Sequence, residues 1–262
     1  MIWIVLVGCR KSPEAPAEIS DLTRFLVREL QTEEADVLGA GLDSLDAHLR
    51  TVDMDGSIVD DRSWSVSNLS DEDLGDYAHP GRDLNDLISI GVVGAELHPI
   101  ENHAEYMMWP VQDNINNGVV YYHRNFPETE DGSCFVDRSC ESILTFNESV
   151  RDNALYEVYL EVWKSWHWVD FGDGRQAVVA FAWFEESWPT TDGKDATLWQ
   201  NFELDVWMDK PDPSDGIWRY YVSWTENDVA DSEDIVAGTI RGAAETRYED
   251  EEKAAGGEIT ME

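Results

Sequence analysis

Two cysteines in the middle of the chain are close enough in sequence to form a disulfide or to hold a metal ion. Cys134 and Cys140 enclose five residues, and no histidine lies beside them. Two thiols alone make an incomplete zinc site, so metal binding is the weaker alternative. The spacing predicts a disulfide, which would form in an oxidising compartment. In the chain-entropy model such a short loop contributes about 2 kcal/mol to stability.

Aromatic side chains alternate with carboxylates in two of the predicted strands. Tyr159 and Trp163 fall on the same face as two glutamates, and Trp199 and Trp207 fall on the same face as two acidic residues. Aromatic rings beside carboxylates can stack a sugar or hold a cationic ligand. These four residues are therefore the candidate ligand-binding positions. The alternative is that they form cross-strand pairs on a solvated face, where Trp and Tyr are favoured.

Catalytic and metal-binding motifs are weak. His98, Glu101 and His103 offer three metal ligands within six residues, but their spacing is not that of a metalloprotease, and Pro99 argues against a helix that would align them. No G-x-S-x-G elbow and no Gly-rich phosphate loop occurs in the sequence. We therefore expect no enzyme activity, no catalytic residues, no metal and no cofactor. A metal-dependent hydrolase is the less favoured alternative.

The start of the chain carries a short apolar run that ends in the third cysteine. Residues 2–5 are Ile-Trp-Ile-Val, and residues 6–9 are Leu-Val-Gly-Cys. This stretch resembles the lipobox of bacterial lipoproteins, although no basic residue precedes it. The resemblance covers nine residues and implies cleavage before Cys9, acylation of Cys9, and a lipid bilayer as partner. Arg10, in place of an aspartate, implies an outer membrane lipoprotein of the cell envelope, facing the periplasm or the cell surface.

The charge of the chain excludes one class of partner. Its 55 acidic and 18 basic residues give a formal net charge of -37. A surface this negative repels the phosphate backbone, so we expect no nucleic-acid partner. The remaining partner is an unknown ligand or protein of the envelope.

The spacing of apolar residues predicts helices first and strands later. Residues 19–50 read as two helices, and residues 51–85 as mostly loop. Nine of the twelve tryptophans lie between Trp163 and Trp224, in segments that alternate with period two. The predicted strands are 119–124, 143–147, 156–168, 176–186, 198–208 and 217–226. A helix follows from Ser232 toward Tyr248.

These elements predict an α+β fold in which an N-terminal helical region precedes an antiparallel β-meander of about six strands and a C-terminal helix. The order resembles the helix-grip architecture of START-like ligand-binding domains, and a lipocalin-like β-barrel is the alternative. The predicted parts are a signal peptide (1–8), a flexible tether (9–18), a helical and loop-rich part (19–110), a Trp-rich β-domain with its helix (111–248) and a disordered acidic tail (249–262).

The predicted function is that of a non-enzymatic, envelope-anchored lipoprotein that binds a ligand or partner through the Trp-rich β-domain. A structural or protein-interaction lipoprotein without a small-molecule ligand is the alternative. Fold alone does not choose between them.

Overall fold

The computed structural model describes residues 14–32, 34–115, 118–152, 156–229 and 232–261, and these residues form one antiparallel sheet of nine strands. The strand order is β1-β2-β9-β8-β6-β5-β4-β3, and β7 pairs with β8. The strands are β1 (Ser63–Trp64), β2 (Ile88–Glu96), β3 (Val119–Asn125), β4 (Ser142–Asp152), β5 (Glu157–Phe171), β6 (Arg175–Trp183), β7 (Trp188–Pro189), β8 (Thr197–Asp209) and β9 (Ile217–Asn227).

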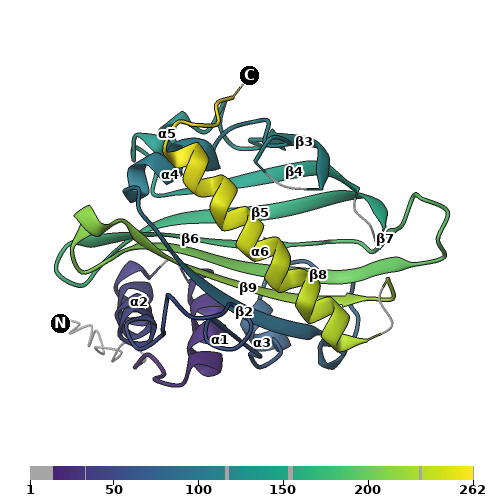
Figure 1. Cartoon of the computed structure of the whole chain (residues 1–262), viewed down its shortest axis with the longest axis horizontal. Helices are drawn as coiled ribbons and strands as arrows, with labels where there is room; N and C mark the ends of the chain where they lie inside the picture. The colour runs from purple at the N-terminus through teal and green to yellow at the C-terminus, as the bar shows by residue number, and fades with distance from the viewer. Residues whose placement is uncertain (1–13, 33, 116–117, 153–155, 230–231, 262) are drawn as a thin grey trace, which may run out of the picture.

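Helices cover both faces of the sheet, and the long C-terminal helix crosses one face diagonally (Figure 1). The helices are α1 (Ile19–Glu29), α2 (Ala35–Leu49), α3 (Asp71–Leu74), α4 (Ile100–Met107), α5 (Ser133–Val136) and α6 (Glu233–Ala255), with short 3-10 turns η1 (Leu84–Asp86) and η2 (Pro213–Asp215). Ser232 begins α6, because its side chain accepts a hydrogen bond from the backbone N–H of Ile235. None of the described helices is long and apolar enough to cross a bilayer.

Alternating side chains of each strand pack on opposite faces of the sheet. In β6, Val179 and Phe181 belong to the core formed with α1 and α2, whereas Val178 and Ala180 belong to the core beside α4. Successive side chains of a strand point to opposite faces, so one strand contributes to both layers. The α6 layer is completed by Ala237, Ala244 and Tyr248, which pack against β2 and β9.

The fold class is the predicted one. The sheet is antiparallel and open, with β1 and β3 at its edges, so it is not a closed barrel, and α6 lies against it in a helix-grip arrangement. The sheet has nine strands, more than the six predicted. The strands that the prediction missed are β1, β2 and β7.

Two predicted boundaries are wrong. The predicted loop-rich part (19–110) contains β2, which pairs with β9 over its whole length and so belongs to the sheet. The predicted disordered tail also begins too early, because α6 continues to Ala255. Glu251 explains the extension: its buried carboxylate accepts hydrogen bonds from Arg219 and Arg247, which anchor the last turns of the helix.

Candidate functional site

A cavity of about 550 Å³ lies between the sheet and α6. Side chains from β3, β4, β5, β6, β8 and β9 form its floor, and α6 covers it. This volume is within the range of small-molecule binding sites. In the helix-grip arrangement α6 packs closely against β2 and β9 and crosses the sheet diagonally, and the cavity lies where its side chains face the strands from β3 to β9.

Part of the cavity wall is apolar. Leu160 and Val162 project from β5, and Phe184 and Leu198 follow from the segments around β6 and β8. Val236 and Ile240 of α6 line the same cavity, together with the small residues Ala243 and Ala244. This part of the wall can hold the hydrocarbon portion of a ligand, because burying apolar surface is favourable by about 25 cal/mol per Å².

The neighbouring part of the wall, on β3 and β4, carries polar side chains. Arg124 of β3 is almost fully buried, and its Nε donates to Asn147 Oδ1 at 2.9 Å. Its Nη2 donates to the Tyr122 hydroxyl at 2.6 Å. Ser149 and Arg151 continue this polar row along β4, at positions that share the face of Asn147. Burial lowers the pKa of Arg124, an effect that Tyr122 opposes.

A network of buried charges underlies the middle of the cavity. Asp205 Oδ2 accepts from Lys164 Nζ at 2.5 Å, and Asp205 Oδ1 accepts from Arg219 Nη1 at 3.2 Å. Arg219 and Arg247 both donate to Glu251 of α6, at 2.9 Å and 2.7 Å. The network thus connects β5, β8 and β9 to the C-terminal helix. Opposite charges at this separation offset the cost of burying each one.

The network shifts the pKa values of its members. Burial by itself raises the pKa of Asp205, but the charges of Arg247, Lys164 and Arg219 hold it well below its usual value. Burial lowers the pKa of Lys164 to about 8, although the neighbouring Asp205 acts in the opposite direction. Asp205 is therefore ionised at neutral pH.

The structure places only one of the four predicted ligand-binding residues in the cavity. Trp207 lines it, and the guanidinium of Arg219 lies 3.6 Å from the centre of its ring. Tyr159 and Trp163 of β5 point to the other face: the Tyr159 hydroxyl donates to Glu148, and Trp163 packs against the core of α1 and α2. Tyr159 and Trp163 are therefore not part of the cavity, because the side chains of β5 that line it are the alternate ones, Leu160, Val162, Lys164 and Trp166.

Trp199 is also outside the cavity, although it has the sequence parity of Trp207. The pairing of β8 with β9 shifts by one residue between Leu198 and Gln200, which is a β-bulge. A bulge inverts the alternation of side chains on one side of it. Leu198 therefore lines the cavity, whereas Trp199 lies against Arg82, whose guanidinium is 4.5 Å from the ring centre.

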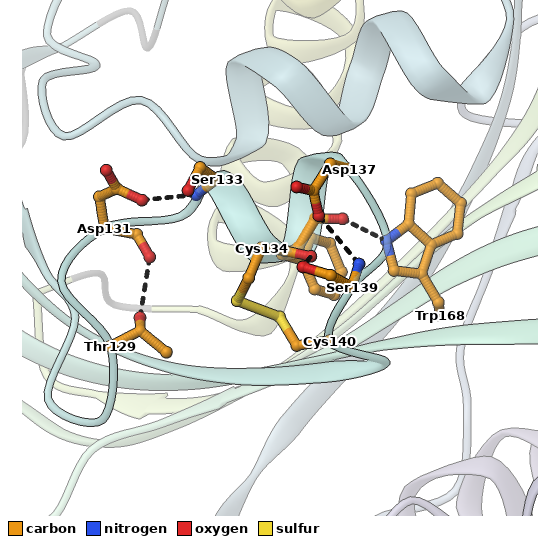
Figure 2. Close-up of a disulfide and its surroundings, with 9 residues drawn as sticks. Thr129, Asp131, Ser133, Cys134, Asp137, Ser139, Cys140 and Trp168 are labelled. Atoms are coloured by element: carbon orange, nitrogen blue, oxygen red, sulfur yellow. Dashed lines mark hydrogen bonds between the residues drawn. A yellow bond between two sulfur atoms is a disulfide. The ribbon is translucent and has the colours of Figure 1, made fainter.

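Cys134 and Cys140 form the disulfide that their spacing predicts, with Cα atoms 5.3 Å apart (Figure 2). The bridge closes the loop that follows α5. Beside it, the indole N–H of Trp168 donates to the Phe135 carbonyl oxygen at 2.8 Å. Together these contacts fix α5 against β5. Cys9 lies outside the described residues.

Of the three possible metal ligands, His98 and His103 both approach Glu252 of α6, and His98 Nε2 lies 3.6 Å from Glu252 Oε1. The prediction that Pro99 argues against a helix here is wrong. Pro99 is the N-cap residue of α4, because a proline fits the start of a helix. His103 turns inward, and its Nδ1 lies 3.2 Å from Glu96 Oε2. Glu252 of α6 approaches these two, so that one ligand atom from each lies within 4.8 Å of the others. Glu101 is exposed and does not join them.

Comparisons with known proteins give remote likenesses in structure. No family model and no curated protein matches the sequence. Human StAR-related lipid transfer protein 5 is 12% identical, with a TM-score of 0.39, over 64% of this chain and 76% of that one. The lipid transfer and protein localization domain of human StarD13 is 11% identical, with a TM-score of 0.35, over 66% and 81%. A protein from Arthrobacter aurescens is 9% identical, with a TM-score of 0.33, over 67% and 90%. Likenesses this remote carry no argument about function, and the cavity must be interpreted from its own residues.

Proposed function

We propose that this protein is a non-enzymatic binding protein that holds a small molecule in the cavity under α6. The observation that carries the proposal is the cavity itself: about 550 Å³ of space, bounded on one part by apolar side chains such as Leu160 and Val162. Natural protein interiors are close-packed, so a cavity of this size is most simply explained as a binding site. The carboxylates of Asp205 and Glu251 are engaged in ion pairs, which leaves neither of them free to act as a general base.

Filling the cavity from the sheet tests this proposal. Ala182 of β6 lines the cavity, and a strand side chain at this position stands roughly perpendicular to the sheet. We expect wild-type protein to enhance the fluorescence of the neutral probe N-phenyl-1-naphthylamine, and Ala182→Leu to reduce that binding at least tenfold. Ser223→Leu, from β9, is a second filling variant.

Ala40→Leu is the matched control, because Ala40 is exposed on α2 and far from the cavity. It adds the same side chain and should leave probe binding unchanged. Urea unfolding of each variant shows that the fold is retained. Probe binding by folded Ala182→Leu and Ser223→Leu at wild-type affinity would contradict the proposal.

We further propose that the mature chain is held at the outer membrane through acylated Cys9, and that its ligand or partner belongs to the cell envelope. The lipobox-like residues 6–9 support the anchor, and the disulfide between Cys134 and Cys140 suits an oxidising compartment.

A cysteine substitution tests the anchor. Cys9→Ser should move the protein from the membrane to the soluble fraction, and intact mass of the membrane-extracted wild-type chain should show an acylated N-terminal cysteine. The double variant Cys134→Ser/Cys140→Ser is the control and should remain in the membrane. A Cys9→Ser protein that still sediments with membranes would exclude lipidation as the anchor.

A further inference from the structure

We propose that the cavity selects an amphipathic ligand with an anionic head, a carboxylate or a phosphate, which is bound by the guanidinium of Arg124. The inference rests on the proposed function and names the class of ligand. It starts from a buried cation that lacks a counter-charge.

Arg124 is 4% exposed, yet no carboxylate of the described residues lies within 4 Å of it. Its hydrogen bonds go to the neutral side chains of Asn147 and Tyr122, and the Trp166 ring centre lies 5.0 Å from the guanidinium carbon. Its Nη1 has no hydrogen-bond partner among the described residues. An arginine stays protonated in proteins, so a full positive charge is held here next to an open cavity.

Other buried cations nearby are paired, which makes Arg124 the exception. Lys164 and Arg219 both contact Asp205, and Arg219 also contacts Glu251. Burying a charge without a partner costs several kcal/mol, and proteins normally avoid it. A ligand anion in the cavity would supply the missing counter-charge and accept hydrogen bonds from the N–H groups of Arg124 Nη1. The planar guanidinium suits this role, because it matches the oxygens of a carboxylate or a phosphate.

The charge of the cavity is inverted relative to the rest of the chain. The whole sequence has 55 acidic and 18 basic residues, but the cavity wall has four basic residues and two acidic ones. The basic residues are Arg124, Arg151, Lys164 and Arg247, and the acidic ones are Glu203 and Glu251. Arg151 resembles Arg124, since its buried Nε also has no hydrogen-bond partner among the described residues. The wall therefore favours an anion where the surface disfavours one.

The division of the wall explains why the ligand should be amphipathic. Arg124, Asn147 and Arg151 lie on β3 and β4, whereas Leu160 and Val162 lie on the next strand, with the apolar residues of α6 above. A molecule with its head at β3 and β4 can extend its hydrocarbon portion across β5 toward Phe184 and Leu198. The head group and the hydrocarbon portion of the ligand are then bound by separate parts of the cavity wall.

Probes that share one twelve-carbon alkyl chain but differ in their head group test the inference in the full-length protein. Dodecanoate, dodecyl phosphate, dodecan-1-ol and dodecyltrimethylammonium are used to displace N-phenyl-1-naphthylamine. A charge-assisted hydrogen bond that replaces an unpaired buried charge corresponds to an affinity gain of about 10- to 100-fold. We expect this preference for one of the two anionic probes over dodecan-1-ol, with the cationic probe the weakest. The stronger of the two anions identifies the head as a carboxylate or a phosphate.

Substitutions then assign the preference to Arg124. Arg124→Met should bind dodecan-1-ol as the wild type does but lose the preference for the anion, and Arg124→Lys should keep part of it. Arg82→Met is the matched control, because Arg82 also lies over a tryptophan but outside the cavity. It should leave every affinity unchanged.

The outcomes separate the two proposals. If no probe binds the wild type, the proposed function fails. If dodecan-1-ol and both anions bind equally well, the cavity is a binding site and only the anionic head is wrong. If Arg124→Met is folded and keeps the full preference, the anion is bound elsewhere. Should Arg124→Met not fold, the comparison of heads in the wild type and in Arg124→Lys still decides the question.

Discussion

The two faces of the sheet are built from the same strands but differ in composition and packing. The face toward α1 and α2 carries apolar side chains such as Phe181, Phe202 and Leu204, each fully buried. The face toward α6 carries Asp205, Arg219 and other charges in its middle and a cavity along β3 to β8. One face is a close-packed core, and the other combines buried charge with empty space.

This difference indicates that one face of the sheet stabilises the fold and the other forms the binding site. Close packing of apolar side chains stabilises a fold, whereas cavities and buried charges reduce stability unless something compensates for them. Packing on the α1 and α2 face therefore stabilises the fold enough to offset the cost of the cavity and the buried charges on the α6 face.

The largest expected effect is the loss of the carboxylate at the centre of the charge network. Asp205→Asn leaves Lys164 without a carboxylate partner among the described residues, while Arg219 keeps Glu96 and Glu251 and Arg247 keeps Glu251. We expect a loss of about 4 kcal/mol in the free energy of unfolding. Asp170→Asn is the control, since Asp170 is exposed and its pairing with Arg138 should contribute less than about 1 kcal/mol. Urea unfolding measures both. A loss below 1 kcal/mol for Asp205→Asn would show that water screens the network.

A matched pair of leucines compares the two faces directly. Leu204 of β8 is enclosed by the core of α1 and α2, whereas Leu160 of β5 borders the cavity. Leu→Ala should cost about 4 kcal/mol at Leu204 but about 2 kcal/mol at Leu160, because a side chain beside an existing cavity has fewer neighbours to lose. Equal losses in urea unfolding would mean that the cavity face is packed as tightly as the other.

Local patterns in the sequence predict the elements better than they predict the site. Period-two alternation predicts most of the strands, and apolar spacing predicts α1, α2 and the start of α6. The strand β2 was missed because its sequence, from Ile88 to Glu96, is buried on both faces and does not alternate. A strand of this kind cannot be distinguished from other apolar segments by periodicity.

The site itself depends on features that a single sequence does not display. The face of Trp199 is set by a bulge, and the pairing of Glu251 with Arg219 depends on α6 crossing β9. One signal in the sequence does point to the site: basic residues are scarce here, yet Lys164 lies in a strand between apolar residues and aromatic rings. A rare cation at a core position of a strand indicates a buried partner or a ligand.

A titration tests the environment of Lys164, with a smaller expected effect. Its pKa is lowered to about 8 in the folded protein, whereas the unfolded lysine keeps its ordinary value of 10.5. Between these pH values the unfolded chain holds more protons, so the free energy of unfolding rises with pH, by at most about 1.4 kcal/mol per pH unit. Urea unfolding from pH 8 to 9.5 should show this slope, and Lys164→Met should flatten it.

The window ends near pH 10 because tyrosines then contribute with the opposite sign. Burial raises the pKa of Tyr248, so at higher pH the folded state holds more protons than the unfolded one. A wild-type slope equal to that of Lys164→Met between pH 8 and 9.5 would place the lysine in a solvated environment.

The smallest effect concerns two glycines within helices, one on each side of the sheet. A glycine inside a helix costs about 1 kcal/mol relative to alanine. A Cβ at Gly242 of α6 would meet no atom within 4 Å, whereas one at Gly41 of α2 would lie 2.7 Å from Leu26 Cδ2. We expect Gly242→Ala to stabilise the protein by about 1 kcal/mol, because it gains helix propensity without a clash. Gly41→Ala should destabilise by about 1 kcal/mol, since overpacking in a tight core outweighs the same gain. Stabilisation by both substitutions, measured by urea unfolding, would show that α1 and α2 can shift apart and that this core is less tightly packed than the structure indicates.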